Sequence, residues 1–208
     1  MKNAGNRHWA LWLSLICIII FILQIAISGF TELFLLDIEK YFEIWRFLTS
    51  IFLHGDLAHL LYNLFALALF GSFLEGLIGS RKFFAVFFVT GIIANLIAVN
   101  FYPSSLGASG AIFGIIGALI IVRPSLMVWA FGLPMPIFIA GILWAIGDLI
   151  GIFVPSNVGN IAHLAGMASG LIMGSFYRDW KERRETRNKE RIIIDEKSMR
   201  NWEDSWAR

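Results

Sequence analysis

Long runs of apolar residues, separated by short polar or charged segments, fill most of the chain between Trp9 and Tyr177. A helix rises about 1.5 Å per residue, so about 20 apolar residues are needed to cross a hydrocarbon core of roughly 30 Å. Six runs reach or approach that length: 9–30, 51–77, 83–101, 109–122, 136–153 and 161–177. The pattern therefore predicts an all-α integral membrane protein, a bundle of six transmembrane helices.

Two segments between these runs are themselves unusually apolar. The segment from Thr31 to Trp45 carries leucine, isoleucine and aromatic residues among its four acids. Aromatic residues are enriched at membrane interfaces. We therefore expect this segment to lie against the outer leaflet. We expect Leu126–Phe131, which precedes Pro134 and Pro136, to lie at the inner interface.

The distribution of charge divides the chain into two parts. Of its 32 charged residues, 18 fall in the last 31 positions, from Arg178 to Arg208. The chain is 58% hydrophobic, against roughly 45–50% in ordinary soluble domains. We interpret residues 1–178 as a six-helix membrane domain and residues 179–208 as a charged cytoplasmic C-terminal tail. The charges after residue 177, 10 basic and 8 acidic, are too mixed to indicate nucleic-acid binding.

Basic residues also predict the orientation, because short loops rich in Lys and Arg stay in the cytoplasm. They occur before the first run, between the second and third, after the fourth and after the sixth, as Lys2, Arg7, Arg81, Lys82, Arg123 and the Arg178–Arg191 cluster. All four sites fall on one side, whereas the alternate loops 102–108 and 154–160 carry no charge. We expect a multi-pass protein of the cell membrane with both termini cytoplasmic.

The fourth run is short for a membrane span. Its 14 residues from Ser109 to Val122 give about 21 Å of helix. If Arg123 marks the inner surface, Ser109 lies below the outer surface, and irregular backbone at that depth requires a water-accessible pocket. Free N–H groups and the positive end of the helix dipole then surround the Ser109 hydroxyl, which suits an oxyanion. The alternative is that Ser109 is only the N-cap of this helix.

The sixth run carries one histidine, His163, near its outer end. An ionisable group within a span usually faces the protein interior and marks function. Small residues recur on both helices and would let them approach closely: Ala162, Gly166, Gly170 and Gly174 on the sixth, and Gly110, Gly114 and Gly117 on the fourth. A hydrogen bond between Ser109 and His163 is then feasible. The alternative is a core histidine with purely structural partners.

A third polar group lies at the outer start of the second run. His59 and Asn63 are four residues apart, so they share one helical face, and both can donate hydrogen bonds to an oxyanion. The competing interpretation is a metal site of His54, His59 and His163, for which the sequence offers no evident fourth ligand. Cys17 is the only cysteine, which excludes an intrachain disulfide or a thiolate cluster.

Four other polar residues within the apolar runs are more typical of structural roles. Glu75 lies near the inner end of the second run and Asp148 near the outer end of the fifth, where each can cap a helix or pair locally. Gln24 and Asn95 are single amides, and amides in this setting tie helices together.

In these motifs the sequence resembles the rhomboid family of intramembrane serine proteases from the first outer loop to the sixth run. The residues that carry the resemblance are Trp45-Arg46, His54-Gly55-Asp56, His59 with Asn63, Glu75, Gly107-Ala108-Ser109-Gly110-Ala111 and Ala162-His163 with Gly166. Their order and spacing agree with the six-helix form of the family.

The resemblance implies a serine endopeptidase that acts on transmembrane protein substrates in the lipid bilayer through a Ser–His dyad without a cofactor. Ser109 would be the nucleophile and His163 its base. The Ser109 backbone N–H, His59 and Asn63 would stabilise the oxyanion. Gly107, His54 and Gly166 would support the site or the substrate, and Trp45-Arg46 would be structural. This scheme requires no aspartate, so helix packing is expected to fix the imidazole in place of a triad's third member.

Two other functions stay open at this point. A rhomboid-like protein that binds or escorts membrane proteins without cutting them would lack the serine or the histidine, and both are present here. A small transporter would contain broken helices and inverted repeats, and the sequence shows no internal repeat.

Overall fold

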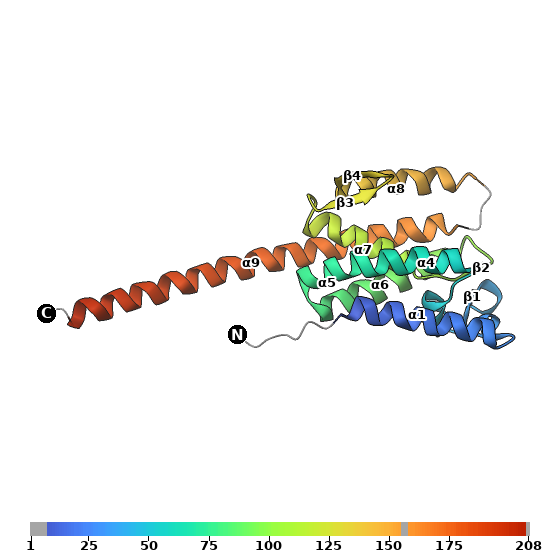
Figure 1. The fold of residues 1–208 in the computed structure, drawn as a ribbon, viewed down its shortest axis with the longest axis horizontal. Coiled ribbons are helices and arrows are strands. Elements are labelled where there is room, and N and C mark those ends of the chain that lie inside the picture. The colour runs from blue at the N-terminus through green and yellow to red at the C-terminus, as the bar shows by residue number, and fades with distance from the viewer. Residues whose placement is uncertain (1–7, 155–157, 207–208) are drawn as a thin grey trace.

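The computed structural model describes residues 8–154 and 158–206, in which the helices pack side by side as one bundle (Figure 1). Its main helical segments are α1 (Trp9–Ala26), α4–α5 (Leu57–Ile78), α6 (Ser80–Ala98), α7 (Ser109–Val122), α8 (Ile137–Gly151) and α9 (Asn160–Trp206). Among the described helices, α1, α4–α5 and α6 are long and apolar enough to cross a membrane, and α7 and α8 are shorter apolar helices. The predicted all-α membrane bundle is confirmed, and the count of six crossings stays a prediction.

The second helix differs from the predicted run in its start and its interior. It begins at Leu57 rather than at residue 51, because the Asp56 carboxylate caps it by accepting the His59 backbone N–H at 2.7 Å. A 3₁₀ turn, η2 (Ser50–Phe52), takes up the preceding residues. Between α4 (Leu57–Ala66) and α5 (Ser72–Ile78) lies a π-helical turn, η3 (Leu67–Gly71).

The segment between α1 and α4, predicted to be the first outer loop, is folded rather than open. It contains α2 (Phe30–Phe34), β1 (Leu36–Asp37), η1 (Ile38–Lys40) and α3 (Arg46–Thr49). Strand β1 pairs antiparallel with β2 (Ser104–Ser105), which ties this loop to the segment before α7. The Arg46 guanidinium is buried and donates to the carbonyls of Glu32 and Leu35 and to the Glu43 carboxylate, which is a structural role.

The segment predicted to be interfacial, Leu126–Phe131, leads into a β-hairpin. Strand β3 (Met127–Ala130) pairs antiparallel with β4 (Leu133–Pro136), and Phe131 and Gly132 form the turn with positive φ. The sequence pattern did not reveal these strands, because Pro134 and Pro136 argue against a strand. A two-stranded ribbon has only edge strands, where proline is tolerated.

The core centres on α7, which packs most extensively against α9 and α6. A Cβ added to Gly166 would meet the Gly110 carbonyl, and one added to Gly170 would meet the Gly114 carbonyl. The predicted close approach of these two helices is therefore confirmed. We call these four residues, Gly110, Gly114, Gly166 and Gly170, the glycine seam.

The last helix extends well beyond the bundle. Figure 1 shows α9 continuing as one helix away from the other elements, so the predicted C-terminal tail is helical as far as Trp206. Several positions used in the prediction of orientation lie outside the described residues: Lys2, Arg7, residues 155–157 and the side chains of 179–191.

Candidate active site

Ser109 is the first residue of α7, directly after an irregular segment that descends from β2. Gly107 in that segment has φ +122°, and its N–H donates to the Ser50 carbonyl at 2.9 Å. The structure assigns the N-cap to Ala108, and the Ser109 hydroxyl lies 2.8 Å from His163 Nε2. The alternative interpretation of Ser109 as only the cap is therefore wrong. The first-turn N–H groups of α7 have no acceptor within the helix and lie beside this hydroxyl.

His163 lies in the first turn of α9, with its ring held on three sides. Nε2 faces Ser109, Nδ1 lies 3.1 Å from Asp148 Oδ1 on α8, and the ring stacks on Phe113 at a centroid distance of 4.3 Å and an angle of 7°. The side chains of His163 and Asp148 are only 12% and 9% exposed. The expectation that helix packing replaces a carboxylate beside the histidine is wrong, because α8 brings Asp148 to the imidazole.

His59 and Asn63 lie on α4 and line the same pocket as Ser109. The Gly55 N–H donates to His59 Nδ1 at 3.4 Å, so neutral His59 carries its proton on Nε2. That nitrogen packs against Gly107, since a Cβ on Gly107 would lie 2.8 Å from it. Asn63 donates one of its two amide hydrogens to the His59 carbonyl at 2.8 Å and keeps the second. Both side chains line the pocket, and each therefore keeps one N–H donor for a further acceptor.

His54 lies behind His59 rather than in the site itself. The residue is 1% exposed, and its ring contacts the His59 ring edge-on at 5.1 Å, while Gln24 holds its backbone N–H and carbonyl. Burial, followed by the neighbouring His59, lowers the pKa of His54 to about 4, so this ring is neutral near pH 7. Among the described residues no three metal-binding side chains are grouped, so the alternative metal site has no geometric support.

The candidate residues open onto one pocket of about 980 Å³. Ser109, His163, His59 and Asn63 all line it, together with apolar side chains from α4, α8 and the hairpin: Tyr62, Phe65, Trp129 and Trp144. This volume is at the upper end of the range for ligand sites, about 300–1,000 Å³. A pocket of this size accommodates several residues of an extended peptide beside the hydroxyl.

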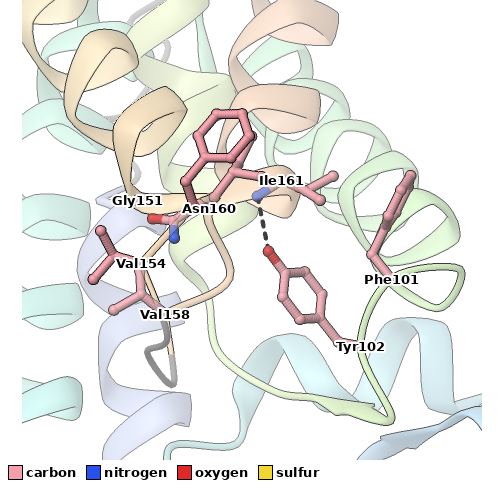
Figure 2. A pocket seen from close by; sticks show the side chains of 9 residues that line it. Phe101, Tyr102, Gly151, Val154, Val158, Asn160 and Ile161 are labelled. Atoms are coloured by element: carbon pink, nitrogen blue, oxygen red, sulfur yellow. Dashed lines mark hydrogen bonds between the residues drawn. The ribbon is translucent and has the colours of Figure 1, made fainter.

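A smaller pocket of about 330 Å³ lies next to it at the start of α9 (Figure 2). In Figure 2 the Tyr102 phenol points at Ile161, whose N–H donates to the phenol oxygen at 3.0 Å. Tyr102 and Val158 line both pockets. Tyr102 thereby anchors the turn of α9 that carries His163.

Sequence reasoning missed the roles of Phe113, Tyr102 and Asp148 around His163. Phe113 follows Ser109 by four residues and therefore lies on the same face of the helix as Ser109, which was a usable signal. Asp148 is a lone carboxylate in an apolar run, which was also a usable signal. Nothing in the sequence indicated Tyr102, because its contact depends on how the loop after α6 folds.

The other polar residues in the apolar runs are structural, as predicted. Glu75 accepts the Ala10 N–H at 3.1 Å and the Ser80 hydroxyl at 2.7 Å. Gln24 ties α1 to the His54 segment, and Asn95 donates to the Phe47 carbonyl and the Ser50 hydroxyl. Gly166 is part of the glycine seam and supports the site only through helix packing.

Comparison with known proteins gives a consistent picture. The family model of the Rhomboid domain matches residues 41–180. Rhomboid protease GluP of Bacillus subtilis is 37% identical over 134 residues, 62% of this chain and 25% of that protein. Rhomboid protease GlpG of Klebsiella pneumoniae is 29% identical over 82% of this chain and 63% of that protein. Rhomboid protease GlpG of Haemophilus influenzae is 30% identical over 84% of this chain and 94% of that protein. The chain thus spans less than two thirds of the length of GluP and of the Klebsiella GlpG.

Proposed function

Because the chain belongs to the rhomboid family, we propose that it is a serine endopeptidase that hydrolyses peptide bonds in or near transmembrane segments of membrane proteins. One observation carries this proposal, the distance of 2.8 Å between Ser109 Oγ and His163 Nε2 in a pocket large enough for a peptide. A serine within hydrogen-bond reach of a histidine that a third group orients is the arrangement of an activated nucleophile.

The reaction begins when Ser109 Oγ attacks the scissile carbonyl carbon and His163 Nε2 takes the hydroxyl proton. The resulting oxyanion accepts hydrogen bonds from the Ser109 backbone N–H, His59 Nε2–H and the free Asn63 amide hydrogen. His163 then returns the proton to the leaving amine, which gives an acyl-enzyme on Ser109. Water repeats the sequence, losing its proton to His163 as it attacks the ester.

The nature of the substrate follows from the surroundings of the pocket. Its walls are formed by helices whose outward side chains are apolar, such as Tyr62 and Phe65 at 77% and 67% exposed. Such exposure is expected next to lipid, and a peptide that arrives there comes from within or beside the bilayer. Transmembrane protein substrates are therefore the partners that this site fits best.

The proposal includes the orientation of the chain. We place it in the cell membrane with both termini cytoplasmic, on the basis of the basic residues at one end of the bundle. Lys82, at the start of α6, lies with its ammonium 5.3 Å from the centre of the Tyr177 ring on α9, so these two helices share that end. Tagging of each terminus and treatment of intact cells with protease tests this orientation, since both tags should stay protected.

The test of the activity is cleavage of a fluorescently tagged transmembrane reporter by purified protein in liposomes. Wild-type protein is compared with Ser109→Ala and His163→Ala. Cleavage by the wild type that is lost in both variants supports the dyad. Reporters that bind all three proteins and stay intact, with several reporters tried, would replace this proposal with a non-proteolytic escort.

A further inference from the structure

Asp148 is a buried carboxylate that the two-residue dyad leaves without a role. It lies on α8, a helix that contributes neither the nucleophile nor the base, and the residue as a whole is 8% exposed. Its Oδ1 lies 3.1 Å from His163 Nδ1, and its Oδ2 has no hydrogen-bond partner among the described residues. Because a carboxylate removed from water is costly unless paired, its single partner, the imidazole, is the feature to explain.

The hydrogen bonds of His163 determine where its proton must be. To accept the Ser109 proton, Nε2 must carry a lone pair, so the neutral ring must hold its hydrogen on Nδ1. That N–H needs an acceptor, and Asp148 Oδ1 is the acceptor at hydrogen-bond distance. When the Ser109 proton arrives at Nε2, the ring becomes a cation and the adjacent carboxylate stabilises it. Asp148 gains and loses no proton in this scheme.

We propose that Asp148 is a positioning residue that completes a relay of Ser109, His163 and Asp148, an inference that rests on the proposed protease function. It selects the reactive tautomer of His163. It also prevents the ring from flipping about its Cβ–Cγ bond, a motion that the Phe113 stack does not oppose. Phe113 restrains the tilt of the ring plane, since the two rings are inclined by 7°. A stack cannot choose between ring orientations that exchange Nδ1 and Nε2, whereas a hydrogen bond to Nδ1 can.

A second buried carboxylate provides a matched control. Glu75 is also 8% exposed, but both of its oxygens are satisfied by the Ala10 N–H and the Ser80 hydroxyl near the inner end of the bundle. The two residues therefore have similar burial and differ in whether they contact the imidazole. If removing any buried carboxylate lowered activity, Asp148→Asn and Glu75→Gln would both lose it. If the loss were specific to the relay, only Asp148→Asn would lose activity.

The experiment compares wild type, Asp148→Asn, Asp148→Glu and Glu75→Gln in the liposome reporter assay, with kcat, KM and the thermal midpoint measured for each. We expect Asp148→Asn to lower kcat by about 100-fold with KM and the midpoint nearly unchanged. Asp148→Glu, which keeps the charged acceptor, should recover part of kcat, and Glu75→Gln should leave it unchanged.

Equal kcat in wild type and Asp148→Asn would overturn the inference, as would equal losses in Asp148→Asn and Glu75→Gln. The rate at which a fluorophosphonate labels Ser109 provides a readout that needs no substrate, and it should fall in Asp148→Asn by a similar factor. An inactive wild type that fluorophosphonate also leaves unlabelled would instead contradict the proposed protease function. An active wild type with an unaffected Asp148→Asn variant would remove only the relay.

Discussion

The α7–α9 pair is held by two different means along its length. In the glycine seam, Gly166 and Gly170 lie so close to the carbonyls of Gly110 and Gly114 that a Cβ added to either α9 glycine would not fit. Where α7 and α9 begin, Ser109 and His163 meet through side chains at 2.8 Å. The seam depends on shape and the polar pair on hydrogen bonds. We infer that the seam determines stability and the distance between the helices, and that the polar pair determines rate.

The largest expected effect is on the seam. Gly170→Ala forces a methyl group against the Gly114 carbonyl, so we expect a loss of about 3 kcal/mol or more in the free energy of unfolding. The matched control is Gly147→Ala on α8, where an added Cβ meets no atom within 4 Å. That variant should be neutral or more stable by about 0.5–1 kcal/mol. Thermal unfolding in detergent measures both, and equal midpoints would refute the role of the seam.

The next effect is on the rate of reporter cleavage and not on the stability of the fold. His59→Ala and Asn63→Ala each remove one proposed oxyanion donor, so each should lower kcat by about 100-fold. Leu61→Ala on the same helix is the control, because Leu61 is 55% exposed and does not line the pocket. Reporter cleavage should be almost unchanged in that variant. If all three variants lost activity equally, α4 would matter for folding and not for the oxyanion.

A smaller effect is expected from acid. Because the folded protein holds the pKa of His54 at about 4, below its usual value near 6.5, only the unfolded chain takes up this proton between those pH values. Stability should therefore be full above pH 6.5 and fall as the pH drops towards 4, by about 2 kcal/mol at pH 5. His54→Phe should remove this part of the pH dependence. Parallel stability profiles for the variant and the wild type would contradict the assignment.

The smallest effect is expected at the end of the chain. The residues that line the pocket lie between Gly55 and His163, whereas α9 continues to Trp206 away from the bundle. Deletion of residues 180–208 should leave kcat for the liposome reporter within about twofold of wild type, since no group touching the reacting atoms is removed. A large change in kcat would instead assign a regulatory role to this part of α9.

The sequence was sufficient to predict the Ser109–His163 pair, because two independent signals agreed. The regular spacing of small residues on both helices predicted close packing, and the short fourth run predicted that Ser109 lies below the membrane surface, which stays a prediction. On α8, the lone carboxylate marked Asp148 as unusual but did not indicate its partner. The surface of this helix is apolar almost all round, so the pattern does not indicate which face turns towards α9.

Other features depended on contacts that no pattern encodes. The start of α4 was misplaced because Ile51, Phe52 and Leu53 are as apolar as a helix interior, and only the Asp56 cap distinguishes them. The β3–β4 hairpin was hidden by its prolines. Both cases reflect local hydrogen bonding that outweighs hydrophobic periodicity.

The most direct test of the central claim is to find which hydroxyl becomes a nucleophile, and whether His163 makes it one. Wild-type protein and His163→Ala are treated in liposomes with a fluorophosphonate, digested and mapped by mass spectrometry. The account predicts one adduct, on Ser109, that is absent from His163→Ala. An adduct on a different residue, or equal labelling of Ser109 in both proteins, would contradict it.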